Sequence, residues 1–172
     1  GTGYDGSLYQ DFWEYDPSTD AWTQKATFPG TARFVAVGFY FAVGNKAYIG
    51  TGWNGSGYYD QSDFWEYDQS TNVWTQKASF GGGQRNGAVG FSIGNKGYIG
   101  TGWNITDSPI YFHQDFWEYD PVADTWTRKA DFGGPGRQTA TGFSIGSKGY
   151  IGLGSELSTN FQDFWEYDQA SD

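Results

Sequence analysis

The hexapeptide DFWEYD occupies residues 11–16, and it recurs at residues 63–68, 115–120 and 163–168. The copies begin 52, 52 and 48 residues apart. A period near 50 residues indicates one supersecondary unit that is copied several times along the chain. The repeat therefore predicts a fold and a binding geometry, and by itself it points to no chemical reaction.

The composition predicts a folded chain rather than a disordered one. Of the 172 residues, 21% are aromatic and 27 are glycine, so the chain has much apolar area to bury and many tight turns. The net charge of −10 argues against nucleic acid or an anionic membrane as a partner, since both require clustered Lys and Arg. No apolar run approaches the roughly 18–20 residues that span a bilayer, so membrane insertion is not expected. The absence of cysteine excludes disulfides and thiol catalysis.

One complete unit extends from residue 85 to residue 132. It contains four short segments rich in aromatic and β-branched residues and bounded by Gly, Pro, Asn or Asp, which is typical of strands. These segments are 85–94, 95–102, 115–120 and 126–132. We refer to them as the first to fourth strands of a unit.

The hexapeptide places large aromatic rings on both faces of a strand. Side chains alternate along a strand, so Trp13 and Tyr15 point to one face and Phe12 points to the other. A sheet with one exposed face would not carry large aromatics on both sides. Four short strands in each unit of about 50 residues therefore predict an all-β propeller, whose four-stranded antiparallel blades pack between neighbours.

Several motifs show a resemblance to a known family. The segment 48–52 reads YIGTG, and a Tyr precedes a Trp at one fixed spacing, as Tyr15/Trp22, Tyr67/Trp74 and Tyr119/Trp126. In these features the chain resembles the kelch family, closest to the galactose-oxidase-like type found in bacterial surface and secreted proteins. The family's glycine doublet is altered here, because it reads Thr51-Gly52 and, in the last copy, Leu153-Gly154.

The expected strands do not make whole units. Units fall at roughly 1–28 (partial), 33–80, 85–132 and 137–172 (partial), which gives thirteen strands, or about three blades plus an overhanging third strand. The prediction is a partial ring with uncovered blade faces. Two interpretations stay open: the remaining blades belong to a longer chain, or two copies form a six-bladed homo-oligomeric ring with one surplus strand displaced at each junction.

An arginine opens each unit, and it provides the first candidate ligand-binding set: Arg33, Arg85 and Arg137. The resemblance implies that these arginines lie near the central channel. There they would form a ring of guanidinium groups that holds a carboxylate or polar ligand. The alternative is structural, with each arginine bound to carbonyls or to a carboxylate between blades.

The loops between the second and third strands vary most between units, and variation on a constant scaffold is typical of specificity. These loops are 4–10, 53–62, 103–114 and 155–162. Tyr4, Trp53 and Trp103 share one position, and Tyr58 and Tyr111 add further rings. Exposed rings beside polar loop groups favour stacking on a sugar or holding a peptide. The alternative is that each ring caps its own blade.

No catalytic, metal or cofactor site is predicted. His113 is the one histidine and has no recognisable nucleophile motif beside it, so a packing or solvated role is expected. The repeated Glu of the hexapeptide is expected to pair with a Lys on the fourth strand, as in Glu14 with Lys25. The repeated Asp that opens the hexapeptide is expected to cap a turn. The copper-radical oxidases that the resemblance reaches need a Tyr crosslinked to a Cys, which this chain lacks.

These observations favour a non-catalytic binding module, secreted or on the cell surface, whose loop face holds a glycan, a peptide or a protein. The alternative is a self-assembling scaffold or adhesin, and a carbohydrate-active enzyme is a more remote third hypothesis. Whether the glycosylation sequons at Asn54 and Asn104 are used stays open.

Overall fold

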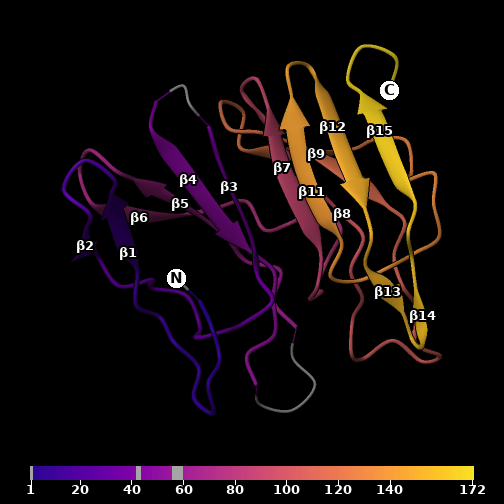
Figure 1. Cartoon of the computed structure of the whole chain (residues 1–172), viewed down its shortest axis with the longest axis horizontal. Coiled ribbons are helices and arrows are strands. Elements are labelled where there is room, and N and C mark those ends of the chain that lie inside the picture. The colour runs from indigo at the N-terminus through magenta and orange to yellow at the C-terminus, as the bar shows by residue number, and fades with distance from the viewer. Residues whose placement is uncertain (1, 42–43, 56–59) are drawn as a thin grey trace.

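The computed structural model describes residues 2–41, 44–55 and 60–172. Over these residues the protein is all-β and consists of small antiparallel sheets, which confirms the predicted fold class (Figure 1). No helix that is long and apolar enough to cross a membrane occurs within the described ranges. The thirteen expected strands are present, and one short hairpin adds two more.

Two sheets are complete four-stranded blades, in which each strand pairs with the next one along the chain. The first contains β3 (Val37–Phe41), β4 (Lys46–Gly50), β5 (Phe64–Asp68) and β6 (Val73–Lys77). The second contains β7 (Val89–Ile93), β8 (Lys96–Gly100), β9 (Phe116–Asp120) and β10 (Thr125–Arg128). In both sheets the hexapeptide forms the third strand.

The sheets at the two ends have fewer strands. The N-terminal sheet pairs β1 (Trp13–Asp16) with β2 (Ala21–Gln24). The C-terminal sheet contains β11 (Thr141–Ile145), β12 (Lys148–Gly152) and β15 (Phe164–Asp168). The loop between β12 and β15 forms the unexpected hairpin of β13 (Ser155–Glu156) and β14 (Thr159–Asn160).

The turn between the third and fourth strands is fixed by the last residue of the hexapeptide. In the first complete blade the Asp68 carboxylate accepts hydrogen bonds from the backbone N–H of Ser70 at 2.8 Å and from its hydroxyl at 2.6 Å. Asp16 makes the same two contacts with Ser18. An Asp that satisfies the backbone in this way favours a tight turn. The hexapeptide therefore encodes both a strand and the turn that ends it.

Aromatic rings fill the space between adjacent sheets. Phe64 of β5 packs against Tyr119 and Trp126 of the following blade, with ring centroids 4.9 and 5.0 Å away. Tyr67 of the same strand packs against Phe12 of the preceding sheet at 4.8 Å. The prediction that both faces of the hexapeptide strand are covered is thus confirmed for the first complete blade.

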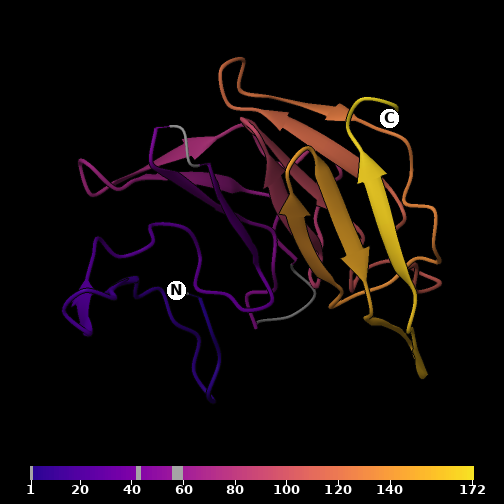
Figure 2. The ribbon, with the colours of Figure 1, turned by 45° about the horizontal axis from the view of Figure 1, so that its top comes forward.

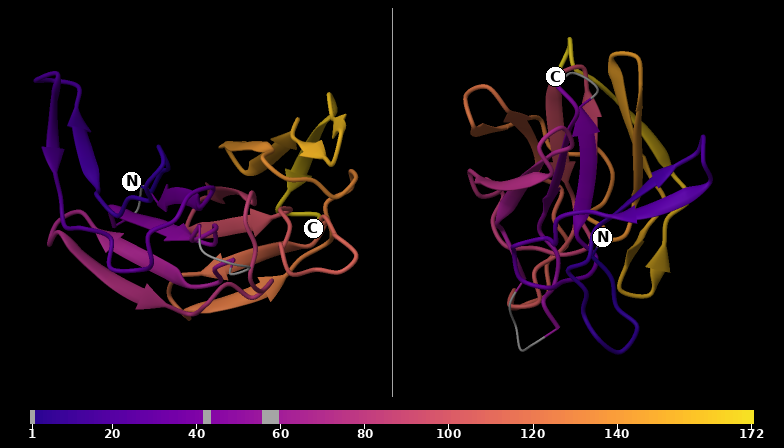
Figure 3. Two further views of the ribbon diagram at one scale, coloured as in Figure 1. Left: turned by 90° about the horizontal axis from the view of Figure 1, so that it is seen from below. Right: turned by 90° about the vertical axis from the view of Figure 1, so that its left-hand side faces the viewer.

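The sheets follow one another around an arc. The first strand of each unit lies on the inner side, with β3 beside β7 and β7 beside β11. Figures 2 and 3 show that the arc is open, with the β1–β2 pair at one end and β15 at the other. The protein is therefore a partial β-propeller with two uncovered ends.

Candidate functional site

The candidate site lies on the side of the arc that carries the variable loops, which we call the loop face. Figure 1 shows loops 4–10 and 103–114 and the β13–β14 hairpin projecting from this same side. Here the residue after each unit's arginine bridges to the residue that opens the variable loop. The three bridged pairs are Phe34/Trp53, Asn86/Trp103 and Gln138/Ser155.

Backbone hydrogen bonds hold the three pairs in one row. Within the middle pair, the Asn86 N–H donates to the Trp103 carbonyl at 2.9 Å, and the Trp103 N–H donates back at 3.1 Å. Between pairs, the Gly102 N–H donates to the Arg137 carbonyl at 2.7 Å. Gly102 has a φ of +85°, and a Cβ there would lie 2.7 Å from the Asn86 carbonyl oxygen, so only glycine allows this approach. The row is therefore fixed by backbone rather than by side chains.

The chemistry of the row changes from aromatic to polar along the arc. At the N-terminal end, Phe34 lies between Trp53 and Tyr4, with centroid distances of 5.2 and 5.3 Å. At the C-terminal end, the partly buried amide of Gln138 and hydroxyl of Ser155 occupy the equivalent places. A ligand that lies along the row meets rings at one end and hydrogen-bonding groups at the other.

The loop 103–114 carries one exposed ring. Tyr111 has 54% of its surface exposed and packs edge-on against His113 at 5.1 Å. Trp103 is half-buried and stacks on Phe112 at 6.0 Å. Tyr4 is 62% exposed at the aromatic end of the row. The structure therefore makes Tyr4 and Tyr111 accessible rings and leaves Trp53 and Trp103 half-buried.

The residue that anchors this loop belongs to no repeated motif, so the sequence pattern does not single it out. Asp60 is fully buried, and its two carboxylate oxygens accept hydrogen bonds from the Ile105 N–H at 2.7 Å and the Asn86 amide at 2.8 Å. Burial raises the pKa of Asp60, although these two hydrogen bonds oppose the shift. Asp60 thus ties loop 53–62 to loop 103–114. Tyr58 lies outside the described residues.

The predicted arginine ring is not available to a ligand, which corrects its ligand-binding interpretation. The side chains of Arg33, Arg85 and Arg137 are completely buried. The Arg85 Nη1 and Nη2 donate to the two oxygens of Asp115 at 2.6 and 2.9 Å, and Nη1 also donates to the Thr101 carbonyl at 3.0 Å. The same guanidinium stands over the Phe80 ring at 4.8 Å.

The other two arginines repeat these contacts, with Arg33 on Asp63 and Arg137 on Asp163. Their Nη atoms donate within the unit, and their flat faces stack on the ring that ends the preceding unit. This geometry favours the structural interpretation that the sequence left open. The partner is the Asp that opens the hexapeptide, so this residue binds an arginine rather than simply capping a turn.

His113 is largely buried and lies beside one carboxylate. Its Nε2 lies 3.5 Å from the Asp107 carboxylate, without the alignment of a hydrogen bond. Burial lowers the pKa of His113, and the charge of Arg85 lowers it further. No group of three or more His, Asp or Glu side chains that could hold a metal ion occurs within the described part of the chain.

The comparisons with known proteins address the fold alone. No protein-family model and no curated protein matches the chain. Among solved structures, the chain is similar to one described as the structure of YjhT, with a TM-score of 0.79 and 22% sequence identity. The match covers 92% of this chain and 56% of that chain, so this chain spans just over half the length of that structure.

Proposed function

We propose that this chain is a non-catalytic binding module of the kelch type, secreted or on the cell surface, whose loop face holds a neutral glycan. The observation that carries the proposal is the fixed row of bridged pairs, which runs from Phe34/Trp53 to Gln138/Ser155. Aromatic rings offer flat apolar faces for the C–H side of a sugar, and amide and hydroxyl groups pair with its hydroxyls.

The charges of the loop face favour a neutral rather than an anionic ligand. The variable loops 4–10, 53–62, 103–114 and 155–162 contain no Lys and no Arg. The three arginines beneath them are buried against Asp carboxylates. An anionic sugar or an acidic peptide would therefore meet no accessible cation on these loops, while the whole chain carries a net charge of −10.

Asp60, the carboxylate that is hydrogen-bonded to the row, supports an anchoring role rather than a catalytic one. Both oxygens of Asp60 accept hydrogen bonds from the protein itself, and its side chain is fully buried. A general acid or base must reach the proton that it transfers. A buried carboxylate that already holds two loops in place serves better as an anchor.

The experiment is a glycan-array screen of the chain with neutral and anionic oligosaccharides, repeated with Tyr111→Ala and with Tyr4→Ala. We expect neutral glycans to bind, and each variant to weaken the best one about tenfold, because each removes an accessible stacking ring. Val122→Ala is the control, since Val122 is 87% exposed in a turn outside the loop face. A screen without any bound glycan, or binding that neither loop variant weakens, would refute the proposal.

A further inference from the structure

His113, the one histidine of the chain, lies at the base of loop 103–114, where the loop returns toward β9. Its backbone N–H donates to the Gly102 carbonyl at 2.8 Å. The same hydrogen bond is made by Gln61 in the first complete blade and by Phe161 in the C-terminal sheet, at 2.8 and 2.9 Å, each to the glycine at the equivalent place. Histidine, glutamine and phenylalanine therefore occupy one structural position in three units.

This position lies beside the buried arginine of its unit. In the C-terminal sheet, the centroid of the Phe161 ring lies 4.3 Å from the Arg137 guanidinium. In the second complete blade, His113 takes the place of Phe161, and the charge of Arg85 acts on the titration of His113. An imidazole that can become positive therefore stands where the equivalent unit has an uncharged ring.

The surroundings of the imidazole favour its neutral form. Its side chain is 20% exposed, and its Nε2 is buried without a hydrogen-bond partner among the described residues. Burial and the Arg85 charge lower the pKa of His113, and the charges of Asp115 and Asp107 oppose this shift only in part. Asp115 is already paired with Arg85, and Asp107 lies 3.5 Å from Nε2 without the alignment of a hydrogen bond. A second proton on the imidazole is thus poorly accommodated while the loop is closed.

The imidazole also contacts the accessible ring of the loop. The Tyr111 ring packs edge-on against His113 at 5.1 Å, and this tyrosine is one of the two rings that the loop face offers to a ligand. Asp107 belongs to the other arm of the same loop, where its N–H donates to the Asn104 carbonyl at 3.1 Å. A change in the charge of His113 therefore acts on both arms of the loop.

We propose that His113 makes the loop face sensitive to pH: a proton taken up by its imidazole loosens loop 103–114 and releases the ligand in mildly acidic solution. The imidazolium has two N–H donors and a positive charge, so it leaves the side of Arg85 for water. Tyr111 then loses the ring against which it packs. The release of a ligand rests on the proposed function, whereas the loosening of the loop is a property of the chain alone.

The direction follows from proton linkage. In the closed loop the pKa of His113 is lowered, and in an open loop, where the imidazole is in water, it returns to about 6.5. As the pH falls below that value, the open loop binds a proton that the closed loop does not, so the equilibrium moves toward the open loop. Between the two pKa values the equilibrium moves by at most about tenfold per pH unit.

The titration of His113 is measured directly by proton NMR. Because the chain has one histidine, its imidazole C2–H signal reports this titration without ambiguity, provided that no histidine tag is added. We expect a midpoint below about 6.5. Asp107→Asn should lower the midpoint further, because it removes the carboxylate that lies beside Nε2. A midpoint at or above about 6.5 in the unaltered chain would overturn the proposal.

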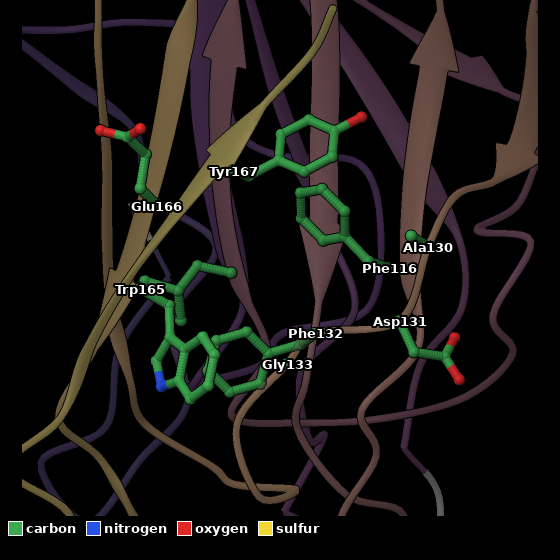
Figure 4. A pocket seen from close by; sticks show the side chains of 9 residues that line it. Phe116, Ala130, Asp131, Phe132, Gly133, Trp165, Glu166 and Tyr167 are labelled. Carbon is green, nitrogen blue, oxygen red and sulfur yellow. The ribbon is translucent and has the colours of Figure 1, made fainter. Parts of the chain in front are cut away.

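Hydrogen exchange measures the loosening of the loop without any ligand. Protection factors, which correct for the intrinsic effect of pH on exchange, should fall about threefold to tenfold in loop 103–114 between about pH 7 and about pH 5.5. The amides of Trp165 and Tyr167 in β15 are the internal reference and should keep their protection; these two side chains line a hollow that His113 does not line (Figure 4).

The chain itself supplies the matched variants. His113→Gln and His113→Phe introduce the residues that occupy the same position in two other units, so both variants should fold, which circular dichroism checks. Neither variant should show the fall in protection. Asp60, which anchors the same loop, is present in both variants, so any titration of its carboxylate cancels in the comparison. An equal fall in the variants, or no fall in the unaltered chain, would overturn the proposal.

The affinity for a neutral glycan separates this proposal from the proposed function. For the tightest glycan of the array, we expect the dissociation constant to rise about threefold to tenfold between about pH 7 and about pH 5.5, and to stay unchanged in His113→Gln. Binding that is independent of pH in the unaltered chain would overturn the role of His113 and leave the proposed function standing. If no glycan binds at either pH, the proposed function fails, and the exchange of the free chain still decides whether His113 controls the loop.

Discussion

Arg85 and Asp115 are 30 residues apart in sequence and joined by two parallel hydrogen bonds of 2.6 and 2.9 Å. The pair connects the start of a blade's first strand to the start of its third, and the guanidinium also stacks on the Phe80 ring of the preceding unit. One side chain thereby ties together two strands of its own blade and the end of the blade before it. The same arrangement recurs at Arg33 and Arg137. The arginine–aspartate pair is therefore the repeated interaction that holds each blade together and joins it to the preceding unit.

Removing one such arginine should destabilise the fold strongly. Arg85→Ala leaves the largely buried Asp115 carboxylate without its opposite charge, with the Trp117 indole as its remaining side-chain donor, and it removes the donor to the Thr101 carbonyl. Breaking a buried pair in this way costs about 3–5 kcal/mol. Chemical denaturation measures the change in the free energy of unfolding. The control is Arg128→Ala, which breaks an exposed pair with Asp131 and should cost less than about 1 kcal/mol. Equal losses in the free energy of unfolding for the two variants would contradict the stabilising role of Arg85.

The arginine–aspartate pair should weaken in acid. Arg137 lowers the pKa of Asp163 from its usual value to about 2, mainly through its hydrogen bonds to the carboxylate. A carboxyl group with a lowered folded-state pKa contributes stability above its unfolded pKa, and this contribution is lost as the pH falls through the folded value. The melting temperature should therefore drop between about pH 4 and pH 2. Asp163→Asn should flatten this part of the profile, and an unchanged profile would count against the assignment.

Glycines at blade faces should differ in their tolerance of a methyl group. A Cβ at Gly90 would lie 2.4 Å from the Val37 side chain of the preceding blade, so Gly90→Ala should cost about 1–3 kcal/mol through overpacking. Gly38 occupies the same position in the first blade, and a Cβ there would meet its nearest atom at 3.6 Å. Gly38→Ala should therefore be neutral or slightly stabilising. Thermal denaturation of the two variants makes the comparison, and a reversed order would refute the packing argument.

Asp60 should contribute to the stability of the fold and hold the loop 103–114 in place. Asp60→Ala removes the acceptor for the Ile105 N–H and the Asn86 amide, so we expect a loss of about 1–3 kcal/mol in the free energy of unfolding. Asp60→Asn keeps one acceptor and should lose less. Hydrogen exchange of the loop 103–114 amides should accelerate in the alanine variant. If exchange stayed unchanged, the anchor role would be wrong.

The sequence predicts the strands and the open arc well. Aromatic rings on both faces of a strand, repeated at a fixed period, directly indicate a blade that is packed on both faces. It did not predict which residues meet across long separations. The sequence pattern predicts a turn cap for the Asp that opens the hexapeptide. Its arginine partner, as in Arg85 with Asp115, lies 30 residues away and becomes its neighbour only after the strands pair.

The expected Glu–Lys pairs show the same limit. Glu14 and Lys25 do pair, at 3.4 Å, but Glu118 of the second complete blade accepts a hydrogen bond from the Tyr98 hydroxyl at 2.6 Å instead. Lys129 reaches Asp172 of the next unit at 2.9 Å. A strand has two neighbours, and the residue pattern alone does not say which neighbour a side chain selects. Asp60 carries no repeat signal at all, because its loop differs in every unit.

The most direct test of the loop-face proposal is hydrogen–deuterium exchange of the chain with and without a saturating concentration of the tightest neutral oligosaccharide from the array. The account predicts slower exchange in loops 4–10 and 103–114 and around Gln138 and Ser155, with no change in the outer turns between third and fourth strands. Slower exchange confined to those outer turns, or to the hollow lined by Phe116, Phe132 and Trp165, would contradict it.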